Sequence, residues 1–217
     1  MIPVVIPAKP LDTALQRLSG VLAADERRAL QTAMLEDVLT AGTGFSNRVI
    51  VVTGDASVAE LARRHGARVA PDADPPAGIN VAVARGIAAT DGQAVLVVMG
   101  DLPCATVADL HRVAAARTPG RGITIAVSGD GTGTNAMLLD PAGLISPEFG
   151  ASSLQRHVAA AEDARIEATL VTAPGLMLDV DTPADLAALA TQAPSSHTRR
   201  LWVSLGLDER LVAAAAG

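Results

Sequence analysis

Aromatic residues are almost absent from this chain of 217 residues, which has two Phe, one Trp and no Tyr. A hydrophobic core must therefore be built from Val, Leu, Ile and Ala. Proteins that bind single-stranded nucleic acids stack the bases on aromatic side chains. The net charge of -6 also lacks the basic excess that a polyanion attracts. We therefore expect no nucleic-acid partner.

Cysteine is as scarce as the aromatics, because Cys104 is the only one. A single thiol excludes an intrachain disulfide and a thiolate-rich zinc site. No apolar run reaches the roughly 18 residues of a membrane helix. The first residues also lack the basic start and the long apolar stretch of a signal peptide. These absences lead us to expect a cytoplasmic enzyme with no membrane partner.

Lysine is nearly missing too, since Lys9 is the only lysine among 17 Lys and Arg residues. A codon bias toward arginine is the simplest explanation. Lys9 nevertheless follows the first predicted strand directly, where ligands approach many α/β proteins. It is therefore a candidate functional residue.

Short apolar runs alternate with amphipathic segments along the chain. Continuous apolar runs predict strands that are buried on both faces. Their alternation with helices predicts a three-layer α/β fold with a mainly parallel sheet. The predicted strands are 1–8, 48–53, 67–70, 93–99, 123–128, 135–139, 168–172 and 178–181; the predicted helices are 25–42, 57–65, 80–89, 106–117, 151–163 and 182–191.

The composition changes near the C-terminus. Residues 192–200 (QAPSSHTRR) are typical of a linker, and residues 201–216 form a weakly specified helical segment. The sequence therefore predicts one domain over 1–191, followed by a linker and C-terminal tail over 192–217.

Three aspartates are the sharpest candidates for chemistry. Asp101 follows Gly100 at the end of the strand 93–99. Asp179 and Asp181 are two residues apart, so on a strand they would share one face. Adjacent carboxylates repel unless a cation offsets their charge. Three of them would form an oxygen site for Mg²⁺, as phosphoryl transfer requires.

A purely structural explanation exists for each aspartate. Asp101 would end a Gly-Asp turn and cap the helix that begins near Thr106. Asp181 would belong to the start of the next helix, where Thr182 and Pro183 favour an N-cap. Asp179 would be a solvated strand residue.

Two glycine-containing segments are candidate anion sites. In residues 129–135 (GDGTGTN), successive glycines let backbone N–H groups line a concavity, although Asp-Gly also favours a plain hairpin. Residues 149–153 (FGASS) open a helix, where free N–H groups favour phosphate, although simple capping is the alternative. Arg156 lies one turn further and would reach the same anion. His157 is expected to be structural.

Two weaker candidates concern a nucleotide. Lys9 and Arg17 in the first loop would pair with a triphosphate, or remain a solvated surface lysine and a helical arginine. Gly78 would allow a close approach, and the Asn80 amide suits a base or a ribose. No GxSxG elbow or GxGxxG fingerprint follows a strand, and the four histidines lack metal-ligand spacing.

Six segments in this order resemble the guanylyltransferase family of deazaflavin-cofactor biosynthesis, the 2-phospho-L-lactate or phosphoenolpyruvate guanylyltransferases. The resemblance covers about residues 2–190. The matching segments are 7–11 (PAKPL) with Arg17 and Leu18, 78–80 (GIN), 100–103 (GDLP), 131–135 (GTGTN), 149–150 with Ser153, Arg156 and His157, and 174–175 leading to 179–183 (DVDTP) with Asp185 and Leu186.

The resemblance implies a nucleotidyltransferase fold related to the GT-A glycosyltransferases. It also implies transfer of GMP from GTP to the phosphate of a small acid, either phosphoenolpyruvate, 2-phospho-L-lactate or phosphoglycerate, with release of pyrophosphate. The implied roles are catalysis by Lys9, Arg17 and Asp101; nucleotide binding by Pro7, Ala8, Lys9, Gly78, Asn80 and Gly100; acceptor binding by Thr134, Gly150, Ser153 and Arg156; and Mg²⁺ binding by Asp101, Asp179 and Asp181. The chain departs from the family at Leu15, where members often carry a second lysine.

Two other functions remain open on the sequence alone. One is a related nucleotidyltransferase with another nucleotide or acceptor, such as a cytidylyltransferase. The other is a nucleotide-binding module without catalysis. The expected partners are GTP and a phosphorylated acid, and the chain would act as a monomer or a dimer.

Overall fold

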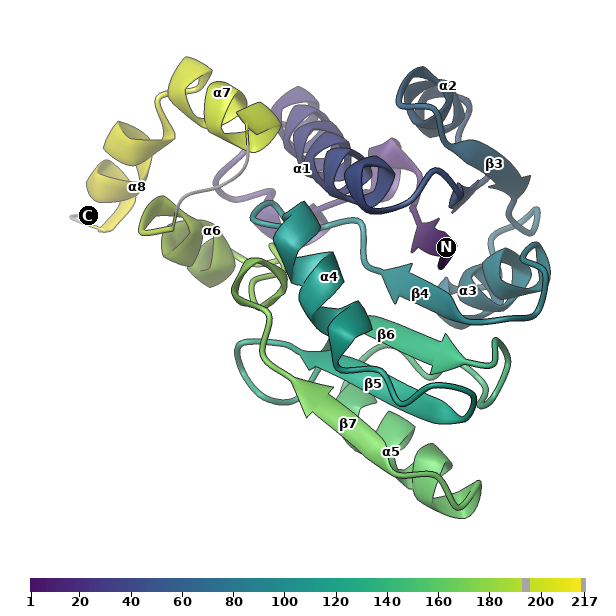
Figure 1. Ribbon diagram of the computed structural model, residues 1–217. Helices are drawn as coiled ribbons and strands as arrows, with labels where there is room; N and C mark the ends of the chain where they lie inside the picture. Colours follow the sequence, from purple (N-terminus) through teal and green to yellow (C-terminus); the bar gives the residue numbers. More distant parts are fainter. Residues whose placement is uncertain (193–195, 216–217) are drawn as a thin grey trace.

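A seven-stranded sheet runs through the centre of the molecule (Figure 1), and a computed structural model describes residues 1–192 and 196–215. The strand order is β3-β2-β1-β4-β6-β5-β7. Only β6 is antiparallel to its neighbours among the described strands, so the predicted mainly parallel sheet is confirmed. The strands are β1 (Val4–Pro7), β2 (Val49–Thr53), β3 (Arg68–Pro71), β4 (Val95–Val98), β5 (Gly122–Val127), β6 (Thr134–Asp140) and β7 (Ala168–Val171).

Helices cover both faces of this sheet. Successive side chains of a strand point to opposite faces. The apolar side chains of a run such as Val4–Pro7 therefore pack into the cores on both faces of the sheet. Val4 and Ile6 pack in the core with α1, α2 and α4, whereas Val5 packs in the core with α3 and α5. The helices are α1 (Ala24–Phe45), α2 (Ala56–Arg64), α3 (Ile79–Ala88), α4 (Val107–Ala115), α5 (Ser153–Asp163), α6 (Pro183–Ala190), α7 (Ser196–Ser204) and α8 (Leu207–Ala215).

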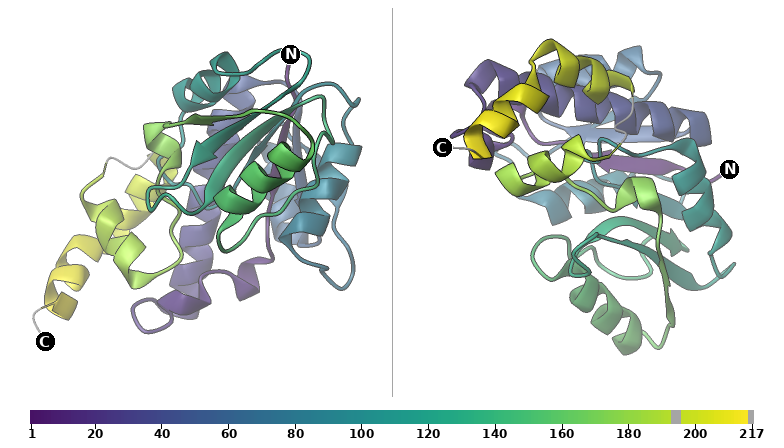
Figure 2. Two further views of the ribbon diagram at one scale, coloured as in Figure 1. Left: turned by 90° about the horizontal axis from the view of Figure 1, so that it is seen from below. Right: turned by 90° about the vertical axis from the view of Figure 1, so that its left-hand side faces the viewer.

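The C-terminal segment is helical over most of the predicted range 201–216, but it differs from the prediction in the linker before it. Helix α7 already begins at Ser196, within the predicted linker, and lies along α1 (Figure 2). The Asp37 carboxylate accepts hydrogen bonds from the backbone N–H groups of His197 and Thr198, both at 2.9 Å. Trp202 is 1% exposed and belongs to an apolar cluster that includes Met34 of α1. The described part of the tail therefore completes the core, and residues 193–195 of the predicted linker lie outside the described residues.

The loops that follow β1 and β4 lie at the same edge of the sheet, because these strands are parallel neighbours. Residues 178–181, predicted as a strand, instead connect the short 3-10 helix η3 (Pro174–Leu176) to α6. Among the described residues, no helix is both long and apolar enough to span a membrane.

Candidate active site

A cavity of about 840 Å³ opens at the carboxyl ends of β1 and β4. Parallel α/β sheets usually bind their ligands at this edge. Most of the residues that the sequence singles out line it, although they come from distant segments. Those lining the cavity are Pro7, Ala8, Lys9, Arg17, Gly100, Asp101, Thr134, Gly150, Ser153, Asp179 and Asp181.

Asp101 is the most perturbed acid in this cavity. Its Oδ1 atom is shielded from solvent and has no hydrogen-bond partner in the described part of the chain. Burial, and then the neighbouring charge of Asp179, raise the pKa of Asp101 to about 6, while Lys9 acts in the opposite direction. A buried carboxylate oxygen beside a second carboxylate fits an oxygen-binding cation, which would offset both charges.

Asp179 is held in place by Asn135 of β6. The Asn135 amide Nδ2 donates to Asp179 Oδ1 at 3.2 Å and to the carbonyl of Leu176 at 2.8 Å. Asn135 is buried, so this contact fixes the carboxylate beside Asp101. Asn135 belongs to the glycine-rich segment 129–135, but the sequence pattern indicates no role of its own for it.

Asp181 faces a cation of the protein itself. Arg17 Nη1 lies 2.7 Å from Asp181 Oδ2, and the two side chains are 71% and 48% exposed. No group of three His, Cys, Asp or Glu side chains forms a ready metal site in residues 1–192 and 196–215. In this structure Asp181 is therefore paired with Arg17, whereas Asp101 lies beside the charge of Asp179.

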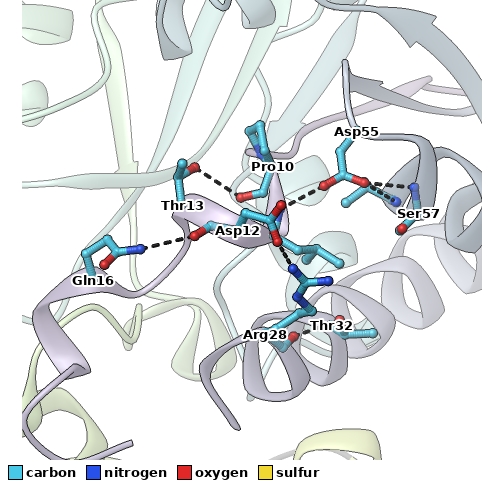
Figure 3. Close-up of polar contacts among 10 residues, drawn as sticks. Pro10, Asp12, Thr13, Gln16, Arg28, Thr32, Asp55 and Ser57 are labelled. Atoms are coloured by element: carbon cyan, nitrogen blue, oxygen red, sulfur yellow. Dashed lines mark hydrogen bonds and ion pairs between the residues drawn. The ribbon is translucent and has the colours of Figure 1, made fainter. Parts of the chain in front are cut away.

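The first loop, between β1 and α1, is anchored from two sides (Figure 3). Asp55 caps α2 by accepting from the Ser57 N–H, and its other oxygen accepts from the Leu11 N–H at 2.9 Å. Asp12 forms an ion pair with Arg28 of α1. The loop backbone is thereby fixed, which sequence reasoning did not predict because these contacts join separate segments.

The two cations of this loop remain accessible. Lys9 and Arg17 are both exposed, and both line the cavity. Leu15 of the same loop is 6% exposed and packs into an apolar cluster. This side chain contributes no charge to the site. We call Lys9 and Arg17 the first-loop wall of the cavity.

The glycine-rich loop before β6 folds around Asp130. Hydrogen bonds from Ser128 and Thr132 lower the pKa of Asp130 to about 2. At Gly133, a Cβ atom would lie 2.8 Å from the Ser128 hydroxyl oxygen, so a larger residue would require the Ser128 side chain to shift. The Gly129–Thr134 segment is therefore a tight, internally bonded loop that leads directly into Thr134.

Thr134, Gly150 and Ser153 form the opposite side, which we call the β6–α5 wall. Thr134 and Ser153 are buried, and the Thr134 N–H donates to Ser153 Oγ at 2.9 Å. Gly150 has φ 116°, which strongly favours glycine. His157, expected to be structural, contacts the Thr134 hydroxyl at 3.0 Å. Its spacing of four residues from Ser153 places both on one face of α5, a signal that could have revealed the contact.

Three predicted residues do not line the cavity. The Asn80 side chain bonds both backbone groups of Phe149: Oδ1 accepts from its N–H, and Nδ2 donates to its carbonyl. Arg156 Nη2 donates to the Glu148 carbonyl at 3.0 Å. Gly78 is exposed at the start of α3. Asn80 and Arg156 thus hold the 148–149 segment next to Gly150 and have no direct place on the cavity wall.

The fold and the cavity define a protein with a nucleotidyltransferase fold. A crystal structure from Desulfovibrio desulfuricans G20 superposes with a TM-score of 0.73 at 18% identity, covering 99% of this chain and 98% of that one. A nucleotidyl transferase from Methanothermobacter gives 0.62 at 20% identity, with 87% and 95% covered. Glucosyl-3-phosphoglycerate synthase from Mycobacterium tuberculosis, solved with Mg²⁺ and uridine-diphosphate, gives 0.56 at 14%, with 80% and 69% covered.

Sequence comparison identifies the family. Residues 2–216 match the family described as "Guanylyl transferase CofC like". Phosphoenolpyruvate guanylyltransferase from Conexibacter woesei is 38% identical over 90% of this chain and 92% of its own. The enzyme of that name from Sphaerobacter thermophilus is 40% identical over 88% and 93%. This chain belongs to the CofC-like guanylyl transferase family, and the recognised resemblance is confirmed.

Proposed function

We propose that this chain transfers GMP from GTP to the phosphate group of phosphoenolpyruvate and releases pyrophosphate. The observation that supports this most strongly is the composition of one cavity. A pair of carboxylates that fits a cation lies between two exposed cations and a buried pair of hydroxyl groups. The names of the relatives favour guanine as the base and phosphoenolpyruvate as the acceptor.

The β6–α5 wall would bind the acceptor. Ser153 and Thr134 supply hydroxyl groups, and Gly150 allows a close backbone approach. A phosphate monoester has a second pKa of about 6, so it is already an anion at neutral pH. Its oxygen would attack the α-phosphorus of GTP, and the bond to the β-phosphate would break. No general base is required, so the task of the protein is positioning and charge neutralisation.

The first-loop wall would bind the triphosphate. Lys9 and Arg17 would contact the leaving pyrophosphate, with Pro7, Ala8 and Gly100 as close backbone neighbours. Asp101, Asp179 and Asp181 would hold Mg²⁺, which offsets phosphate charge when bound. Asn80 and Arg156 would act by supporting the loop before Gly150, and Gly78 would lie near the nucleoside.

The proposal extends to the acceptor class. 2-Phospho-L-lactate and phosphoglycerate carry the same phosphate and carboxylate groups as phosphoenolpyruvate, so all three are candidates for one pocket. With any of these acceptors, the reaction would belong to deazaflavin-cofactor biosynthesis.

An acceptor and nucleotide panel tests this proposal. Pyrophosphate release is measured for GTP, CTP, ATP or UTP together with each of the three acids. The masses of the products are determined by mass spectrometry. We expect turnover with GTP and phosphoenolpyruvate, and its loss when Mg²⁺ is chelated. Faster turnover with CTP would point to a cytidylyltransferase. Tight GTP binding without pyrophosphate release for any acid would point to a binding module.

A further inference from the structure

His157 lies behind the β6–α5 wall, and neither charge neutralisation nor nucleotide binding uses it. The ring is fully buried on α5, between the segment before Gly150 and the start of β6. Its Nδ1 atom lies 3.0 Å from the Thr134 hydroxyl oxygen. Its Nε2 atom accepts the backbone N–H of Glu148 at 2.9 Å. The Phe149 ring packs against it edge-to-face, with centroids 4.9 Å apart.

These contacts determine which nitrogen of His157 carries hydrogen. A nitrogen that accepts a backbone N–H must offer a lone pair, so Nε2 carries none. Burial, with a smaller effect of the Arg156 charge, lowers the pKa of His157 to about 4. The ring is therefore neutral at pH 7 and has a single hydrogen, which must lie on Nδ1. It follows that Nδ1–H donates to the Thr134 oxygen.

The direction of the His157–Thr134 hydrogen bond determines whether the Thr134 hydroxyl can donate to a further group. Because the Thr134 oxygen accepts from His157, its own hydrogen is available to another acceptor. No further hydrogen bond of this hydroxyl occurs within the described residues, and Thr134 lines the cavity. Ser153 is arranged in the same way, since its oxygen accepts the Thr134 N–H. Both hydroxyl groups can therefore donate to an anion in the cavity.

We propose that His157 is a positioning residue that holds the Thr134 hydroxyl as a donor to the anionic group of the acceptor. This role deepens the proposed function and rests on it. It predicts that the β6–α5 wall selects anionic oxygens by hydroxyl donors, because this wall itself carries no positively charged side chain.

A matched pair of substitutions tests the role. In His157→Asn, the side-chain amide can retain an N–H near the Nδ1 position. In His157→Gln, it can retain an acceptor near the Nε2 position but loses the donor to Thr134. Without the His157 donor, the Thr134 hydroxyl is no longer held toward the acceptor, and the hydrogen bond that it would donate to the charged group is weakened. We therefore expect His157→Gln to raise the acceptor KM about 10-fold. The GTP KM should stay unchanged, and His157→Asn should stay near wild type.

A double-mutant cycle separates positioning from simple support of the fold. Thr134→Val removes the hydroxyl, so adding His157→Gln to it should raise the acceptor KM no further. Fully multiplicative effects, or equal changes in the acceptor and GTP KM values, would overturn the role. If the wild-type chain turns over GTP while His157→Gln keeps its acceptor KM, only the role of His157 fails. If the wild-type chain has no turnover with any acid, the proposed function itself fails.

A measurement on the unmodified protein covers the case in which the variants do not fold. Nitrogen-15 NMR of the histidine side chains at pH 7 distinguishes the two neutral tautomers. We expect hydrogen on Nδ1 of His157 and a lone pair on Nε2. Hydrogen on Nε2, or a doubly protonated ring, would overturn the inference whatever the activity shows.

Discussion

The two walls of the cavity are built in opposite ways. On the β6–α5 wall, Thr134 and Ser153 are buried and connected by hydrogen bonds between neutral groups. On the first-loop wall, Lys9 and Arg17 are exposed, and an ion pair joins Arg17 to Asp181 at the surface. Buried networks keep one arrangement, whereas exposed ion pairs contribute only about 0–1 kcal/mol and exchange partners easily. The β6–α5 wall, which is the proposed acceptor side, is therefore preorganised. The Lys9 and Arg17 side chains, on the proposed triphosphate side, can rearrange as a ligand arrives.

The largest expected effect is at Asp101, which lies between the two walls. Asp101→Asn keeps the size of the side chain but removes the charge that would hold Mg²⁺. We expect turnover to fall roughly 1000-fold, or about 4 kcal/mol of transition-state stabilisation. Pyrophosphate release measures the loss, and Asp163→Asn, an exposed change at the end of α5, is the control. Full Mg²⁺-dependent activity of Asp101→Asn would show that the metal assignment is wrong.

The pH dependence of stability tests the burial of neutral His157 behind the β6–α5 wall. The pKa of His157 is about 4 in the folded chain, below its ordinary value of 6.5. Between these pH values the unfolded chain binds a proton and the folded chain does not, so stability falls as the pH falls. The loss should approach the order of 3 kcal/mol by pH 4.

Asp101 opposes this trend, because its raised pKa makes the folded chain bind a proton below about pH 6. Urea unfolding at pH 7 and pH 4 should therefore be compared in the Asp101→Asn background. There we expect the full loss from His157, and a smaller one in the wild type. A free energy of unfolding that does not change with pH in Asp101→Asn would mean that His157 is not buried in its neutral form.

Substitutions of Lys9 in the first-loop wall should have a smaller effect on activity, and this effect should be limited to the KM for GTP. Lys9→Ala removes the only lysine from the loop that faces the cavity, so we expect the GTP KM to rise about 10-fold, or about 1.4 kcal/mol. The acceptor KM should hardly change, and Lys9→Arg should recover part of the loss. Unchanged GTP kinetics in Lys9→Ala would mean that Lys9 is a solvated surface residue and does not bind GTP.

The smallest effect on stability should come from the Arg17–Asp181 pair. Arg17→Ala should change the free energy of unfolding by less than about 1 kcal/mol, because both side chains are exposed. Arg48→Ala breaks a comparable exposed pair with Asp91, remote from the cavity, and should cost as little. Only Arg17→Ala should raise the GTP KM. Similar GTP KM values in both variants would mean that Arg17 does not take part in GTP binding.

Much of this arrangement could be predicted from local sequence. Alternating apolar runs predicted the mainly parallel sheet, and Gly100-Asp101 after a buried strand predicted an acid at its carboxyl edge. The contacts that could not be predicted join distant segments. His157 meets Thr134 only when α5 packs beside β6, and Asn80 meets Phe149 across 69 residues. Trp202 likewise brings α7 into the core only through tertiary packing against α1.

The most direct test of the proposed GMP transfer traces the α-phosphorus of GTP into the product. The chain is incubated with Mg²⁺, phosphoenolpyruvate and GTP that is labelled at the α-phosphate. The proposed transfer predicts that all transferred label appears in a product whose mass is that of GMP plus phosphoenolpyruvate minus one water, with one unlabelled pyrophosphate released per product. Labelled GMP or GDP without such an adduct would contradict it.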